Sequence, residues 1–109
     1  MTQGIISITK RNKVVFKCVA GCNGFNAEKT AKAIKKKGKY DLKSLWDICV
    51  KNDFGDPDCS LVVQSKNDFM CANKEEGLSE LYFDKFSDAN FNPRWECGMT
   101  PHLEIIKLK

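Results

Sequence analysis

The sequence predicts an α+β fold in which two central helices pack on a mostly antiparallel sheet, with elements in the approximate order ββααββββ. Runs of β-branched and aromatic residues near both ends of the chain predict strands, and two consecutive segments between them carry apolar residues at helical spacing. No repeat, low-complexity tract or linker interrupts the 109 residues. One layer of helices against one sheet therefore accounts for the chain as a single compact domain, 1–109.

A β-hairpin is expected at the beginning. Ile5, Ile6 and Ile8 form a β-branched run, and residues 14–20 form a second one. Such side chains pack well on a pleated surface. The residues R-N-K between the runs predict a tight turn, because Asn12 tolerates the left-handed conformation that short hairpin loops need.

A glycine-flanked cysteine turn follows, in the stretch V-A-G-C-N-G-F-N. Gly21 and Gly24 bracket Cys22 and Asn23, and glycine permits both positive φ and close backbone approach. Asn26 is then expected to cap a helix through its side-chain oxygen. The sequence therefore predicts a sharp passage from strand to helix.

The first helix is predicted to have a narrow apolar stripe on one side and a basic face on the other. Ala27, Ala31 and Ile34 recur at helical spacing, and Gly38 stands where a left-handed residue usually ends a helix. Lysines occupy most of the remaining positions.

The second helix has the clearest amphipathic pattern in the chain. Asp41 is a good cap, and Leu42, Leu45, Trp46 and Cys49 fall at i, i+3, i+4 and i+7. A breaker cluster at residues 52–58 ends it. Strands are then expected at residues 60–65, 69–72, 81–86 and 103–108.

The cysteines are expected to be reduced. No run of about 18 to 20 apolar residues could span a bilayer, and the N-terminus lacks a signal-peptide layout, so a cytoplasmic protein without membrane contact is predicted. Thiols stay reduced there. The only close cysteine pair, Cys18 and Cys22, lacks zinc-ligand spacing, so neither a metal nor another cofactor is expected.

Charge is unevenly distributed along the chain. Residues 1–51 carry 12 Lys/Arg against 3 Asp/Glu, whereas residues 52–109 carry 6 against 11. This polarity favours a noncatalytic protein that binds an acidic protein surface, with nucleic acid as the alternative partner and a solvated lysine face as the plainest explanation. The predicted partner-binding residues are Lys29, Lys32, Lys35, Lys36, Lys37 and Lys39.

Two resemblances bear on function. The hairpin followed by V-A-G-C-N-G-F-N and a helix, over residues 4–38, resembles small uncharacterised phage and bacterial proteins. In size, compactness and charge the chain is also similar to phage counter-defence proteins such as anti-CRISPRs. The resemblance implies an inhibitor that occludes a host protein.

Thiol chemistry is a further alternative. Asp58-Cys59-Ser60 is similar to the D-C-S motif of papain-like peptidoglycan hydrolases, which implies Cys59 as nucleophile and His102 as its base, although Leu61 replaces the glycine that follows the motif. Cys22, before a helix, is the other candidate nucleophile. Phosphate-loop, dinucleotide and H-E-x-x-H motifs are missing, so no catalytic residue is assigned.

Overall fold

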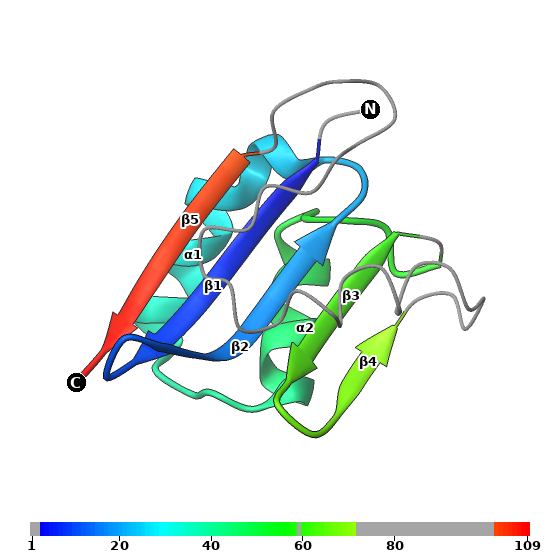
Figure 1. Ribbon diagram of the computed structural model, residues 1–109. Coiled ribbons are helices and arrows are strands. Elements are labelled where there is room, and N and C mark those ends of the chain that lie inside the picture. Colours follow the sequence, from blue (N-terminus) through cyan, green and yellow to red (C-terminus); the bar gives the residue numbers. More distant parts are fainter. Residues whose placement is uncertain (1–2, 59, 72–101) are drawn as a thin grey trace.

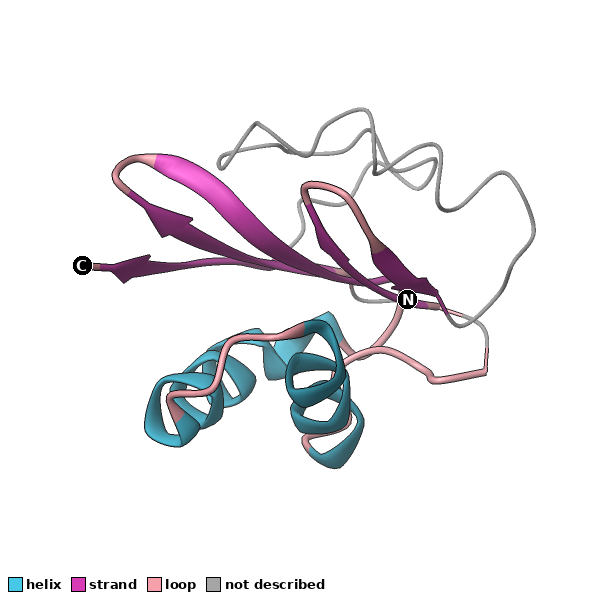
Figure 2. Ribbon diagram, turned by 90° about the horizontal axis from the view of Figure 1, so that it is seen from below, coloured by secondary structure: helices cyan, strands magenta, loops and turns pink. Residues whose placement is uncertain are grey.

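The computed structural model describes residues 3–58, 60–71 and 102–109. They form two layers, a five-stranded sheet with two helices on one face (Figures 1 and 2). The elements are β1 (Gly4–Lys10), β2 (Lys13–Ala20), α1 (Ala27–Lys37), α2 (Leu42–Lys51), β3 (Leu61–Ser65), β4 (Phe69–Cys71) and β5 (His102–Leu108). The predicted α+β class is confirmed.

Strands β1 and β2 form the expected hairpin. Their antiparallel register runs from Gly4 opposite Ala20 to Lys10 opposite Lys13, with one irregularity after Ile8. Arg11 and Asn12 both have positive φ, 55° and 64°. Two successive left-handed residues make the type of turn whose twist matches that of the flanking strands.

The strand order is β4-β3-β2-β1-β5, so the C-terminal strand lies beside the N-terminal one (Figure 1). β5 pairs with β1 in parallel, whereas the other neighbouring strands are antiparallel. The sheet is therefore mostly antiparallel, as expected, with one parallel pair of strands at the β5 edge. The strand predicted at residues 81–86 lies outside the described residues.

The main core lies between the sheet and the helices. α1 packs beneath β1 and β5, and α2 packs beneath β2, β3 and β4. Phe54, just after α2, is also fully buried in this layer. Trp46, on the predicted apolar face of α2, is partly buried and packs against the margin of this core. The core side chains are Ile6, Ile8, Cys18, Ala20, Ala27, Ala31, Ile34, Leu45, Cys49, Phe54, Leu61, Val63 and Ile106.

The opposite sheet face is also buried at its centre. Ile5, Val19 and Val62 are in mutual register there and are almost inaccessible to solvent. In the next row Lys17 is fully buried, and its strand register places it between Ser7 and Gln64. Lys17 is therefore excluded from any solvent-facing basic surface.

Candidate docking surface

The turn between β2 and α1 positions the first helix. A single 3-10 turn, η1 (Gly24–Asn26), leads into α1. Asn23 Nδ2 donates to Asp53 Oδ1 at 3.2 Å, and Asn26 Nδ2 donates to the Asp53 carbonyl oxygen at 2.8 Å. The start of α1 is thus tied to the loop after α2. The expectation that the Asn26 side chain caps α1 is wrong: its oxygen makes no cap hydrogen bond, and its Nδ2 donates to Asp53 instead.

The two glycines of this turn have the close approach that the sequence suggests, but not the positive φ. The left-handed residue is Asn23, with φ of 56°, and neither Gly21 nor Gly24 is in that region. A Cβ at Gly24 would overlap Gln3 C and Gly4 N. Glycine is therefore required here because the turn lies directly against the first strand.

All six lysines predicted to bind a partner are exposed. Lys32 Nζ forms an ion pair with Glu28 Oε1 at 3.1 Å, one turn earlier on the same helix. Over the described ranges the other five have no ion-pair partner: Lys29, Lys35, Lys36, Lys37 and Lys39. Uncompensated ammonium groups at this density produce a local positive potential that attracts anionic groups.

The lysines of α1 point in more than one direction. Successive residues of an α-helix are rotated by about 100°. Lys29, Lys32 and Lys36 therefore form an outward spine opposite the buried stripe. Lys35 and Lys37 lie about 200° apart, on opposite flanks of the helix. The predicted residues do not converge on one pocket.

One flank of α1 combines with α2. A surface hollow of about 410 Å³ lies between the helices, over Ala33 and Ile48, and is lined by Lys36, Lys37 and Lys51. Lys51 was not among the predicted residues. Helix packing places it on the wall of the same hollow as Lys36 and Lys37, and no local sequence pattern indicates that arrangement.

An adjoining hollow of about 360 Å³ shares part of this wall. Lys37, Lys39 and Lys51 line it, together with Asp47. Lys43 Nζ lies 3.0 Å from Asp47 Oδ1, so that carboxylate already has a cation on its own helix. The net charge of the residues that line the two hollows is therefore positive.

Asp41, at the start of α2, is engaged by its own helix. Its Oδ1 accepts a hydrogen bond from the Ser44 backbone N–H at 2.9 Å, and its Oδ2 accepts one from the Ser44 hydroxyl at 3.0 Å. The backbone bond, then the hydroxyl, and further the charge of Lys39 lower the pKa of Asp41. The predicted cap is confirmed.

The sheet contributes a second group of cations. The β1–β2 hairpin ends in Lys10, Arg11 and Lys13, and the parallel register places the end of β5, with Lys107 and Lys109, beside it. The loop after α1 reaches the same end of the molecule, as Figure 1 shows. We call the five cations of the hairpin and of β5 the basic hairpin end: Lys10, Arg11, Lys13, Lys107 and Lys109. Across the described part of the chain they have no ion-pair partner.

Among the described residues, the candidate thiol Cys22 does not lie next to a histidine, as a catalytic Cys–His pair would require. Cys22 Sγ lies 3.0 Å from Ser60 Oγ, which in turn accepts the Asp56 backbone N–H at 2.9 Å. His102 is exposed on β5, and β1 and β2 separate it from Ser60 at the start of β3. Cys59 lies outside the described residues. The structure therefore pairs Cys22 with a hydroxyl and does not bring His102 to it.

Two other cysteines belong to the core. Cys18 on β2 and Cys49 on α2 are fully buried. A hydrogen bond with Cys18, followed by burial, raises the pKa of the Cys49 thiol well above its ordinary value. Such a thiol is held in its protonated, unreactive form.

Comparison with known proteins does not assign a function. Neither a protein-family model, a curated protein nor a solved structure matches the chain. In the described ranges, no three His, Cys, Asp or Glu side chains cluster so that they could hold a metal ion. Among those residues there is also no helix with the length and apolar character needed to cross a membrane.

Proposed function

We propose that this protein is a noncatalytic binding protein whose lysine-rich α1 surface covers an acidic surface of a partner protein. The observation that carries this proposal is the uncompensated charge of α1: four of its five lysines, and Lys39 just after it, have no ion-pair partner among the described residues. The hollows shared with α2 extend the same positive surface through Lys51. Complementary charge of this kind raises association rates and selects partners.

The resemblance to phage counter-defence proteins suggests the consequence of binding. An inhibitor that acts by occlusion needs an exposed, correctly charged surface and no catalytic group. The exposed lysine spine meets the first need. We therefore propose inhibition of a host protein by blocking its acidic surface.

The test is charge reversal on the spine and one flank. We expect Lys32→Glu, Lys35→Glu and Lys36→Glu together to leave the fold nearly intact, since exposed substitutions usually change stability little. Binding to a partner captured from lysate of the native host and then purified should be lost. Calorimetric titration with that purified partner measures it, and far-UV circular dichroism checks folding.

A charge-conserving triple variant is the matched control. Lys32→Arg, Lys35→Arg and Lys36→Arg should bind as the wild type does. Equal binding by the Glu and Arg variants would remove α1 from the interface. Tight binding of duplex DNA at physiological salt, with affinity falling steeply as salt rises, would instead favour the nucleic-acid alternative.

A further inference from the structure

β5 leaves one edge of the sheet without a neighbouring strand in the described part of the chain. It is the last strand in the order β4-β3-β2-β1-β5 and pairs with β1 alone. Its seven residues keep an unbroken register with Gly4–Lys10, and it contains neither a proline nor a bulge. Proteins commonly protect edge strands by shortness, proline or bulges. None of these three devices is present in β5, although it carries a fourth one, the charged side chain of Lys107.

The hydrogen bonds of β5 show which backbone groups face outward. The His102 N–H donates to the Gln3 carbonyl at 2.8 Å, and the Ile106 carbonyl accepts from Thr9 Oγ1 at 3.5 Å on the β1 side. In a parallel pair, alternate residues direct their N–H and C=O to the same neighbour. Residues 102, 104, 106 and 108 therefore bond toward β1. Leu103, Ile105 and Lys107 direct theirs away from the sheet.

The outward residues are accessible. Leu103 is 43% exposed and Ile105 is 39% exposed, and Lys107 is exposed as well. Among the described strands only β1 pairs with β5, so none of them takes up the outward backbone groups of these three residues. They form a row of donors and acceptors that an additional strand would pair with.

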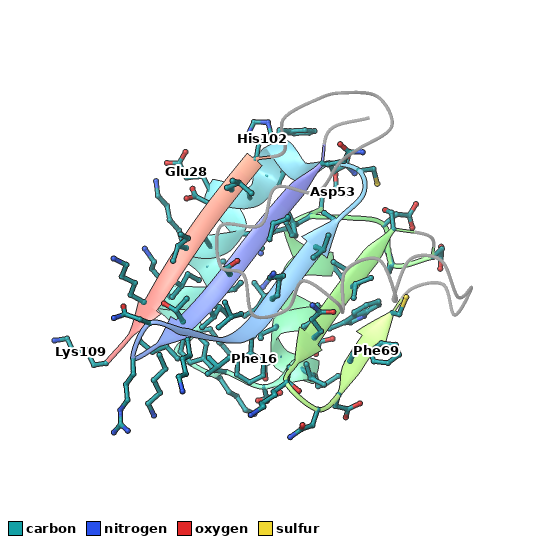
Figure 3. All side chains as sticks on the ribbon, viewed as in Figure 1. Phe16, Glu28, Asp53, Phe69, His102 and Lys109 are labelled. Carbon is teal, nitrogen blue, oxygen red and sulfur yellow. The ribbon has the colours of Figure 1, made fainter. Side chains whose placement is uncertain are left out.

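The surroundings of this edge determine the charge of a suitable strand. Lys107 and Lys109 lie along and beyond the end of β5, and Lys35 lies on the flank of α1 that faces away from α2. Figure 3 shows Glu28, on the same flank, beside the outer edge of β5, where Lys32 neutralises it. Glu104, the one acid of β5, points to the helix side of the sheet because Leu103 and Ile105 occupy the other face. A basic strand would be repelled, and an acidic one attracted.

We propose that the outer edge of β5 binds an extended acidic segment of the partner protein by β-strand addition. Main-chain hydrogen bonds to Leu103, Ile105 and Lys107 hold the segment, and its carboxylates face the neighbouring lysines. This inference rests on the proposed function and specifies the partner surface as a strand rather than a helix or a folded patch.

Hydrogen exchange provides a residue-specific test. The probe is a synthetic peptide, Thr-Glu-Val-Glu-Val-Glu-Thr, added to the isotope-labelled full chain at physiological salt. We expect it to slow amide exchange at Leu103, Ile105 and Lys107 by at least about tenfold. The amides of residues 104 and 106 already bond to β1 and should change little. A peptide with lysine in place of each glutamate should have no effect.

Two substitutions at one position separate backbone pairing from side-chain contact. Ile105→Pro removes an outward N–H without removing a bond to β1, and proline is tolerated at strand edges. Ile105→Thr keeps the N–H and the β propensity. Ile105→Pro should weaken binding of the acidic peptide about tenfold, the scale of one or two lost hydrogen bonds, while Ile105→Thr should bind nearly as the wild type does.

Each outcome decides between defined alternatives. Absence of protection, or equal protection by the lysine peptide, would overturn strand addition and leave Lys107 as a charge that keeps the edge unpaired. Protection that depends on protein concentration without peptide would identify a second copy of this chain as the occupant and also overturn the proposal. If charge reversal on α1 abolishes partner binding but Ile105→Pro does not, the proposed function stands and the strand mechanism fails.

Discussion

Gly24 shows how a single residue determines where the first helix begins. Its 3-10 turn lies against the start of β1, and a Cβ would overlap the backbone of Gln3 and Gly4. Neither strand nor turn can move away easily, because Asn23 and Asn26 hold the turn to Asp53 on the other side. Backbone packing, rather than a left-handed conformation, therefore requires glycine at this position.

The corresponding prediction concerns stability. We expect Gly24→Ala to lower the free energy of unfolding by about 3 kcal/mol or more, since the overlap is with backbone that cannot rotate aside. Gly21→Ala is the control: its Cβ would lie 3.1 Å from Ser60 Cβ, a side-chain contact that small shifts relieve. Gly21→Ala should lower the free energy of unfolding by about 1 kcal/mol. Urea unfolding measures both, and equal losses would contradict the backbone explanation.

At the scale of elements, α1 and α2 both hold their acids in local contacts, but α1 carries more lysines than it has acids to pair with them. α2 holds its carboxylates in local contacts, Asp41 with Ser44 and Asp47 with Lys43. α1 leaves most of its lysines unpaired, and three of them lie in its last turn, where the negative end of the helix dipole favours them. Helix stability and an uncompensated docking surface are therefore compatible in α1.

Acidification should weaken α2 through Asp41. Its folded pKa is lowered by the Ser44 hydrogen bonds, so the stabilisation is present above the usual carboxyl range and is lost as pH falls through the folded pKa. At pH 7 we expect Asp41→Ala to lower Tm by about 5 °C. The difference in Tm between Asp41→Ala and the wild type should become smaller below about pH 4.

Asp41→Asn is the matched variant for this experiment, because asparagine caps helices without a titrating charge. Its Tm should stay near the wild-type value at pH 7 and show a smaller loss on acidification. Thermal unfolding followed by circular dichroism at both pH values measures the effect. A constant gap between Asp41→Ala and the wild type at all pH values would show that the carboxylate is not the stabilising form.

At the scale of the whole molecule, two layers enclose the thiols of Cys18 and Cys49 between β2 and α2. A reagent reaches them only when the layers separate. Cys22, in the turn after β2, is only partly buried. The order of cysteine labelling therefore reports whether the layers open together or locally.

In the folded protein, iodoacetamide should alkylate Cys22 at least about tenfold faster than Cys18 or Cys49, because both core thiols are inaccessible. Mass spectrometry of proteolytic peptides resolves the three positions. Denaturant should make the three rates equal. Labelling of Cys49 at the rate of Cys22 in native buffer would contradict a closed core, and labelling of Cys22 faster than a free thiol would revive the catalytic alternative.

Strand pairing also brings together basic residues that lie far apart in the sequence. The basic hairpin end combines Lys10, Arg11 and Lys13 with Lys107 and Lys109, nearly one hundred residues later, because β5 pairs with β1. The same pairing creates the open edge at Leu103 and Ile105. Neither feature depends on the local pattern of either strand.

The sequence by itself determined the local elements. The hairpin turn at Asn12, the cap at Asp41 and the helix end at Gly38 were all predicted, because neighbouring residues decide turn conformation, capping and helical periodicity. Exposure of the α1 lysines followed in the same way from the apolar stripe at Ala31 and Ile34. These are short-range effects, and a few residues are enough to define each of them.

Only the tertiary structure decided which distant residues meet. The parallel place of β5 beside β1 depends on pairing between the two ends of the chain, and the position of Lys51 near Lys36 depends on how two consecutive helices pack. Asn26 shows the same limit on a small scale: local preference predicts a cap, but the side chain makes none and donates through Nδ2 to the carbonyl of Asp53, 27 residues away. Long-range contacts gain their free energy from the assembled core, so no window of neighbouring residues contains the information that specifies them.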